Sequence, residues 1–261
     1  SLRKLRPEES LQILEYARSS WTFPIAQNHR DRDCAGHLRR CDYVEAVIHD
    51  RAGLPRIALA KWMAAYWDWS PWSCWLAVRA NEMTAAKRGF WALTQSDDSA
   101  RQNRGWYGYA FLALVKGNGP KALEFIANTD DEITRRAVVT VEAWASAIED
   151  PASIDQLNVF DLTGIYGVDF IEGRRGGLWI DGLLPGSPLL TATTPLFGKD
   201  IVMAINGIPL NSEDNLQQLR QQSPNNSTIT LTVRRRDRVF ETTFNVEQAR
   251  TGIRNALQLE R

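Results

Sequence analysis

Cysteine and histidine side chains near the N-terminus have the types and spacing that a metal site requires. Cys34, His37 and Cys41 stand at positions i, i+3 and i+7, which lie on one face of a helix. Thiolate sulfur and imidazole nitrogen are the ligands that Zn²⁺ prefers, and a structural zinc site needs four ligands. The candidates for the fourth ligand are His29, His49 and Cys74.

The same cysteines allow two other interpretations. A disulfide between Cys34 and Cys41 requires a non-helical segment, because residues seven apart on a helix differ by about 10 Å in rise. Alternatively, the thiols are inert structural side chains, as cysteines on an apolar face commonly are. Since the spacing matches no familiar zinc motif, we favour inert thiols and expect no cofactor.

Catalytic motifs are missing from the sequence. A serine protease would need a Gly-x-Ser-Gly-Gly turn with a partner His and Asp, whereas the one serine next to a glycine is Ser187. The sequence also has no HExxH helix, no phosphate-binding glycine loop and no dinucleotide fingerprint. We therefore expect a non-catalytic protein.

Helices must position the residues of the first part of the chain. Up to Asp150, apolar residues recur three and four apart, with breaks at Pro, Gly and Asn. This pattern indicates an all-α domain, which is either an irregular bundle or a degenerate helical repeat. The predicted helices are residues 8–19, 35–51, 55–67, 73–94, 99–116, 120–128 and 130–148.

Tryptophan is concentrated in this helical region, where nine of the ten Trp residues lie. Large aromatics fill gaps between short helices, and each buried indole needs one hydrogen-bond acceptor. The segment 70–73 resembles a corner between helices, so packing is the favoured role. An aromatic-lined cleft for a polypeptide or a glycan is the alternative. The five clustered side chains are Trp62, Trp67, Trp69, Trp72 and Trp75.

After Pro151 the pattern changes to short runs of apolar and polar residues between glycine-rich turns. Residues 177–182, 199–206 and 228–234 read as half-buried strands, and Asn206-Gly207 is a tight-turn signal. The sequence therefore predicts an α+β chain with a helical domain at 1–150, a linker at 151–159, a second domain at 160–247 and a helical tail at 248–261. Arg234, Arg235, Arg236 and Arg238 are expected at a solvated strand end or hairpin turn.

Four motifs follow one another in the second domain. They are Gly164-Ile165-Tyr166-Gly167-Val168, Gly177-Leu178-Trp179-Ile180, Pro185-Gly186-Ser187-Pro188, and a run from Gly198 to Gly207 that reads Gly-Lys-Asp-Ile-Val-Met-Ala-Ile-Asn-Gly. A short helix around Leu216 and Leu219 and a strand at 229–233 complete the series. This series resembles the PDZ family, in the arrangement found after HtrA-type bacterial serine proteases and in other envelope proteins.

The resemblance implies a small β-barrel or sandwich that binds a peptide as an added strand along residues 168–172. The glycine-bearing loop 164–168 would offer backbone N–H groups to a terminal carboxylate, and side chains of the following strand and the short helix would line a pocket for an apolar last residue. Residues 189–197 depart from the family pattern where a short helix is usual. The implied site residues are Gly164, Ile165, Tyr166, Gly167, Val168, Phe170, Leu216 and Leu219.

Bulk properties limit the class of partner. The chain has 31 Lys and Arg against 31 Asp and Glu, so no global field would attract nucleic acid. No apolar window is long enough for a transmembrane helix, and we expect the chain as given to be soluble. The first residue is Ser rather than Met, which is compatible with a removed signal peptide or a membrane anchor upstream of Ser1.

These observations predict a scaffold or adaptor that captures the C-terminus or an extended strand of a partner protein. The bacterial envelope or periplasm is the expected compartment, and the cytoplasm is the alternative. One rival interpretation is the regulatory portion of a larger envelope protease. Another is a helical adaptor in which the PDZ unit holds a homo-oligomer together.

Overall fold

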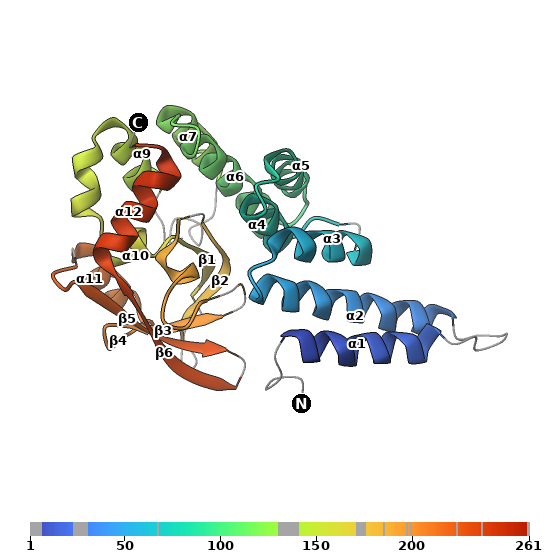
Figure 1. Ribbon diagram of the computed structural model, residues 1–261. Coiled ribbons are helices and arrows are strands. Elements are labelled where there is room, and N and C mark those ends of the chain that lie inside the picture. The colour runs from blue at the N-terminus through green and yellow to red at the C-terminus, as the bar shows by residue number, and fades with distance from the viewer. Residues whose placement is uncertain are drawn as a thin grey trace. The chain divides into compact units, whose positions relative to one another are not determined.

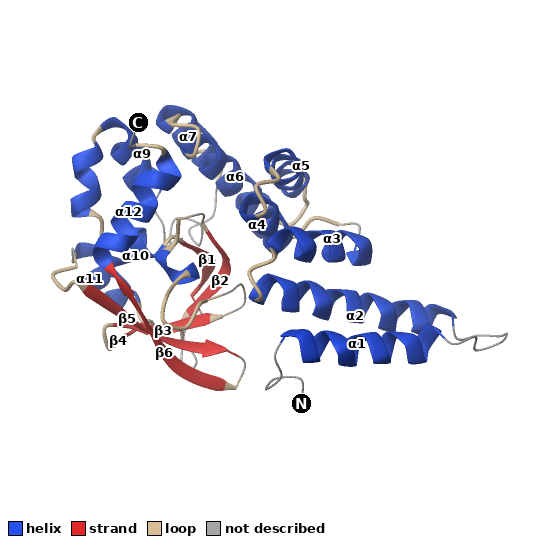
Figure 2. Ribbon diagram, in the orientation of Figure 1, coloured by secondary structure: helices blue, strands red, loops and turns tan. Residues whose placement is uncertain are grey.

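The computed structural model describes residues 7–22, 31–66, 68–129, 141–170, 176–184, 186–196, 198, 200–222, 224–235 and 237–259. The chain divides into two compact units, Ser1–Ala86 and Lys87–Arg261. Helices make up the first unit, and the second combines helices with an antiparallel sheet (Figures 1 and 2). The predicted α+β class is confirmed.

The first unit consists of helices that pack in chain order, α1 on α2, α2 on α3 and α3 on α4. Ser70 and Ser73 cap α4 reciprocally, and Pro71 starts it, as suits the first turn of a helix. The prediction of one continuous helix over residues 73–94 is wrong. Asn81 has a left-handed φ of 59°, which ends α4 and separates it from α5. The helices are α1 (Pro7–Thr22), α2 (Asp31–Arg51), α3 (Pro55–Tyr66) and α4 (Pro71–Arg79), and α5 (Met83–Thr94) begins in the first unit and continues into the second.

Close helix packing opens the second unit. Gly108 of α6 lies against the ring of Phe90, and Gly105 lies against the backbone at Thr94, so a Cβ at either glycine would overlap α5. Asp98 caps α6 by accepting from two backbone N–H groups. The predicted helix 130–148 is seen from residue 141 onward, and 130–140 lie outside the described residues. The elements are α6 (Ser99–Leu114), α7 (Gly119–Ile126) and α9 (Val141–Glu149).

The segment predicted as a linker is a packed part of the second unit. Helix η2 (Pro151–Gln156) contains Ile154, which is fully buried, and α10 (Val159–Thr163) is buried along its whole length. Helix η2 contacts both α9 and α12, so it connects the helices before it to the C-terminal part of the unit. The segment 151–159 thus lies where the chain changes from helices to strands. That it also separates two domains stays a prediction.

The strands form one antiparallel sheet in the order β1-β2-β3-β5-β6, with β4 beside β3. Alternation along β5 is regular: Ile229, Leu231 and Val233 are fully buried between more exposed threonines. The predicted turn is confirmed, since Asn206 and Gly207 take φ of 49° and 79° between β3 and β4. The strands are β1 (Ile165–Phe170), β2 (Leu178–Leu183), β3 (Ile201–Ile205), β4 (Ile208–Pro209), β5 (Thr228–Arg235) and β6 (Arg238–Asn245).

Three helical elements complete this part of the chain: η3 (Pro188–Leu190), α11 (Glu213–Gln221) and α12 (Val246–Leu257). The described residues after η3 are bends rather than a helix, which agrees with the sequence departure noted there, and Leu196 is fully buried as an apolar anchor. The predicted helical tail is α12, which starts two residues before the predicted boundary at 248.

Candidate functional site

Strand β1 lies at the end of the sheet, where its described pairing is with β2 (Figure 2). An end strand presents main-chain N–H and C=O groups that another extended chain can pair with. Strand β1 starts directly after Gly164, which has a left-handed φ of 61° and terminates α10. The turn and the strand edge are therefore contiguous.

Two irregularities bend the β1–β2 pair around Gly167. Tyr166 pairs with Gly182 but Gly167 pairs with Ile180, so β2 has one extra residue at this point. Between Gly167 and Phe170 the extra residue is on β1. Bulges increase local twist and redirect main-chain groups. They occur in the segment where the sequence predicts main-chain contact with a peptide.

Ser187 holds the turn that precedes β1. Its hydroxyl donates to the carbonyl oxygen of Thr163 at 2.5 Å and accepts from the N–H of Leu189 at 3.3 Å. A Cβ at Gly164 would lie 2.9 Å from the Cβ of Ser187, so both the backbone angle and this contact require glycine. The N–H of Leu184 donates to the carbonyl oxygen of Gly164 at 2.9 Å and ties the turn to the end of β2.

Ile165 is already bonded within the chain. Its N–H donates to the Thr163 hydroxyl at 3.2 Å, and its side chain is fully buried. A carboxylate at this loop would therefore be bound by N–H groups that follow Ile165, unless the bond to Thr163 is exchanged. The role of Ile165 as a donor stays a prediction.

For the other predicted site residues, the structure describes some side chains and not others. Leu216 and Leu219 lie on one face of α11 and are each 2% exposed, so they belong to the core. Gly167 is placed by its pairing in β1, but the side chains of Tyr166, Val168 and Phe170 lie outside the described residues. The apolar pocket that these side chains were expected to share with α11 stays a prediction.

A polar cavity of about 250 Å³ lies between α9, η2, α10 and α11. Ser146, Gln156, Asp161 and Arg220 are among the residues that line it. The main-chain oxygen of Asp161 accepts the indole N–H of Trp144 at 3.1 Å, which fastens the cavity wall to α9. Sequence reasoning missed this cavity because its residues come from four separate elements.

Asp161 also acts on a buried phenol. Tyr107 on α6 is 3% exposed, and its pKa is raised far above the ordinary value because of burial, with further contributions from the negative charges of Asp161 and Glu142. Tyr107 therefore stays protonated throughout the physiological range.

A buried ion pair explains part of the basic cluster. The Nε and Nη2 atoms of Arg235 donate to the two carboxylate oxygens of Asp200 at 2.8 and 2.7 Å, and Asp200 is 1% exposed. The prediction that these arginines lie at a hairpin is confirmed, because Arg235 pairs with Arg238 at the β5–β6 turn. The prediction of a solvated side chain is wrong for Arg235, because its guanidinium pairs with the buried carboxylate of Asp200. Arg236 lies outside the described residues.

Cys34, His37, Cys41 and His49 are on α2, which is continuous from Asp31 to Arg51, whereas Cys74 is a buried free thiol on α4. The disulfide alternative is wrong, because the helix separates Cys34 from Cys41, and Cys41 is a free thiol. The side chains of Cys34 and His37 and the whole of His29 lie outside the described residues. Among the residues that are described, no group of three metal-binding side chains occurs, and a zinc site stays a prediction.

The aromatic cluster of the first unit is a packed group. Trp62 stacks on Tyr66 with ring centroids 4.5 Å apart, and its edge contacts Trp72 at 5.1 Å. The indole of Trp72 donates to Asp50, whose carboxylate also binds Arg79. Since the polar atoms are used internally, packing is the better-supported role of this cluster.

Among the described residues of the cluster, Trp75 is fully buried and the indole of Trp62 donates to the carbonyl oxygen of Asp68 at 3.1 Å. The indoles of Trp62 and Trp72 thus each have a hydrogen-bond acceptor within the first unit. Trp67 lies outside the described residues.

Comparison of the chain with protein-family models, with curated proteins and with solved structures found no match. No helix in the described part of the chain is both long enough and apolar enough to span a membrane. The geometry of the β1 edge and the Gly164 turn is therefore the basis for proposing a function.

Proposed function

We propose that residues 160–247 are a PDZ-type module and that the protein is a non-catalytic scaffold or adaptor. The module binds the C-terminus or an extended strand of a partner protein by adding it to β1. The observation that carries this proposal is the position of β1 at the end of the sheet, directly after the Gly164 turn. Main-chain pairing at such an edge gives affinity, and nearby side chains give selectivity.

The order of elements supports the proposal. Strands β1, β2 and β3, helix α11 and strand β5 follow one another in the order of the motifs on which the resemblance is based, and β6 is a further strand after them. The Gly-Ser-Pro motif also has a physical role in this scheme, because Ser187 fixes the backbone on the N-terminal side of Gly164. No cofactor is needed for such binding. A place in the bacterial envelope belongs to the same proposal.

A titration of the full chain with a peptide pool tests the binding mode. Each peptide is presented with a free and with an amidated C-terminus. Tighter binding of free, apolar-ended peptides is expected if N–H groups of the loop capture a carboxylate. Equal binding of both forms would indicate pairing with an internal strand, and absence of binding would refute the proposal.

Gly164→Ala locates the site. Alanine disfavours φ of 61° and meets Ser187, so the turn must shift; we expect at least about a tenfold loss of peptide affinity, or about 1.4 kcal/mol. Gly117→Ala is the matched control, because Gly117 also has a left-handed φ, of 71°, but a Cβ there meets nothing within 4 Å. Equal affinities of the two variants would place the site elsewhere.

A further inference from the structure

Helix α12 packs against the elements that carry the Gly164 turn. Its buried face consists of Val246, Ala249, Ile253 and Leu257, and the helix contacts α10, η2, η3 and β6. Helix α10 ends at Gly164 and η3 starts beside Ser187. The C-terminal helix thus touches the helix that ends at Gly164 and the short helix that follows Ser187.

One close contact of α12 is between two glycine backbones. A Cβ on Gly252 of α12 would overlap the carbonyl oxygen of Gly186, and a Cβ on Gly186 would overlap the carbonyl oxygen of Gly252. No side chain can lie between these backbones, so movement of α12 moves the turn at 186. Ser187 follows directly and is bonded to the carbonyl oxygen of Thr163. A continuous series of contacts therefore runs from α12 to Gly164.

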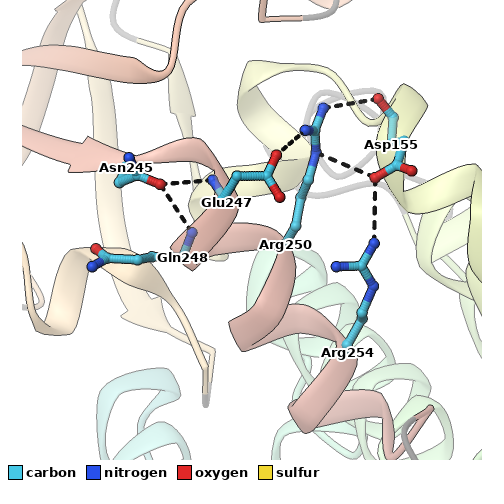
Figure 3. A network of polar contacts seen from close by, with 6 residues as sticks. All are labelled: Asp155, Asn245, Glu247, Gln248, Arg250 and Arg254. Atoms are coloured by element: carbon cyan, nitrogen blue, oxygen red, sulfur yellow. Dashed lines mark hydrogen bonds and ion pairs between the residues drawn. The ribbon is translucent and has the colours of Figure 1, made fainter.

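Charged side chains fasten the outer face of α12 to η2 (Figure 3). Arg250 donates to the main-chain oxygen of Asp155 at 3.0 Å, and its Nε lies 3.7 Å from the Asp155 carboxylate. Arg254 donates to the same carboxylate at 3.3 Å. Glu247 pairs with Arg250 from the preceding turn of the helix. The carboxylate of Asp155 thus forms ion pairs with both Arg250 and Arg254.

A further hydrogen bond fixes the end of the helix. The side-chain amide of Gln258 donates to the main-chain oxygen of Val115 at 3.0 Å, after α6 has ended. Helix α12 is therefore connected at two places to segments that precede the sheet in the chain, and at Gly252 to the turn beside β1.

We infer that α12 is a positioning element for the β1 edge, and that its contacts with Asp155 set the affinity with which this edge binds peptide. The inference rests on the proposed function and adds a means of regulation to it. A partner or modification that separates α12 from η2 weakens binding at β1. Because coupling between sites is reciprocal, a bound peptide stabilises the contact of α12 with η2 by the same factor.

Asp155→Ala tests the coupling with little risk to folding, since the Asp155 side chain is 60% exposed. We expect amides at 164–168 to exchange hydrogen faster, and peptide affinity to fall about two- to fivefold, the range that exposed ion pairs supply. In the wild type, bound peptide should slow exchange in α12. Glu124→Ala is the matched control, because Glu124 is 63% exposed and also ion-paired, but on α7.

Gly252→Ala provides a second variant with a larger effect in the same direction, because its Cβ displaces the turn itself. Unchanged exchange at 164–168 and unchanged affinity in Asp155→Ala would overturn the coupling and leave the peptide site intact. If the wild type binds no peptide, the proposed function fails. The exchange comparison then decides the positioning role alone: faster exchange in Asp155→Ala supports it, and equal exchange overturns it.

Discussion

Single residues of the second unit are constrained by what they touch. Gly252 stands inside a helix, where glycine costs about 1 kcal/mol relative to alanine, yet the carbonyl of Gly186 leaves no room for a methyl group. Ser187 is 4% exposed, and its hydroxyl both donates and accepts. These residues act through backbone placement, so their functional effect is on the geometry of the β1 edge.

The buried phenol of Tyr107 predicts a specific loss of stability in alkali. Its folded-state pKa is raised above its unfolded value by burial, so both states are protonated below about pH 10. Above that pH the unfolded chain releases the proton and the folded chain keeps it, so the free energy of unfolding falls as pH rises. Between pH 9.5 and 11 this loss amounts to about 1 kcal/mol.

Urea unfolding of the wild type and of Tyr107→Phe across this range checks the prediction. The variant should lose about 1 kcal/mol less than the wild type over the interval. Tyr109→Phe is the control: burial raises the pKa of Tyr109 too, but its hydroxyl donates to the carbonyl oxygen of Lys87 in a more exposed setting, so its effect should be smaller. Identical pH profiles for the wild type and Tyr107→Phe would contradict the assignment.

At the scale of elements, the Arg235–Asp200 ion pair joins the end of β5 to the residue that precedes β3. Arg235→Ala leaves the carboxylate of Asp200 buried without its bidentate donor, and we expect a loss of about 2 to 3 kcal/mol of stability. Arg235→Lys should recover part of the loss at most, because lysine lacks the planar fork. Arg238→Ala, at the exposed position opposite, should cost less than about 0.5 kcal/mol. Comparable losses from Arg235→Ala and Arg238→Ala in thermal unfolding would contradict this.

Much of the element order could be predicted from periodicity and turn residues, since most helices and the strands β2, β3 and β5 occur where the sequence indicates them. The break at Asn81 was missed although asparagine tolerates a left-handed φ, because Ala and Arg before it favour a continuous helix. Helix η2 was read as linker because six residues show too few turns for an apolar period to be recognised. The contact of Gly186 with Gly252 joins positions 66 residues apart in sequence (252 − 186), and a single sequence carries no signal for such a pair.

At the scale of the whole molecule, the change from helices to strands does not coincide with the compact units. The units divide between Ala86 and Lys87. Helices α6, α7 and α9 therefore belong to the same unit as the sheet. Trp144 of α9 contacts Phe111 and donates to the carbonyl oxygen of Asp161, so removal of α9 would expose the buried residues of α10. The helices before residue 150 thus supply part of the support for the proposed peptide-binding edge.

Two fragments distinguish the boundary at 86 from the predicted boundary at 151. A fragment of residues 83–261 retains the whole of α5 and every contact of α10 and α12 described within the second unit, and it should unfold in one cooperative transition. A fragment of residues 151–261 loses the hydrogen bonds that join Trp144 to α10 and Val115 to the end of α12, and we expect it to be at least about 3 kcal/mol less stable. Urea denaturation followed by circular dichroism measures both. Equal stability of the two fragments would show that the strands and their helices form a domain without α9, and would support the boundary predicted from the sequence.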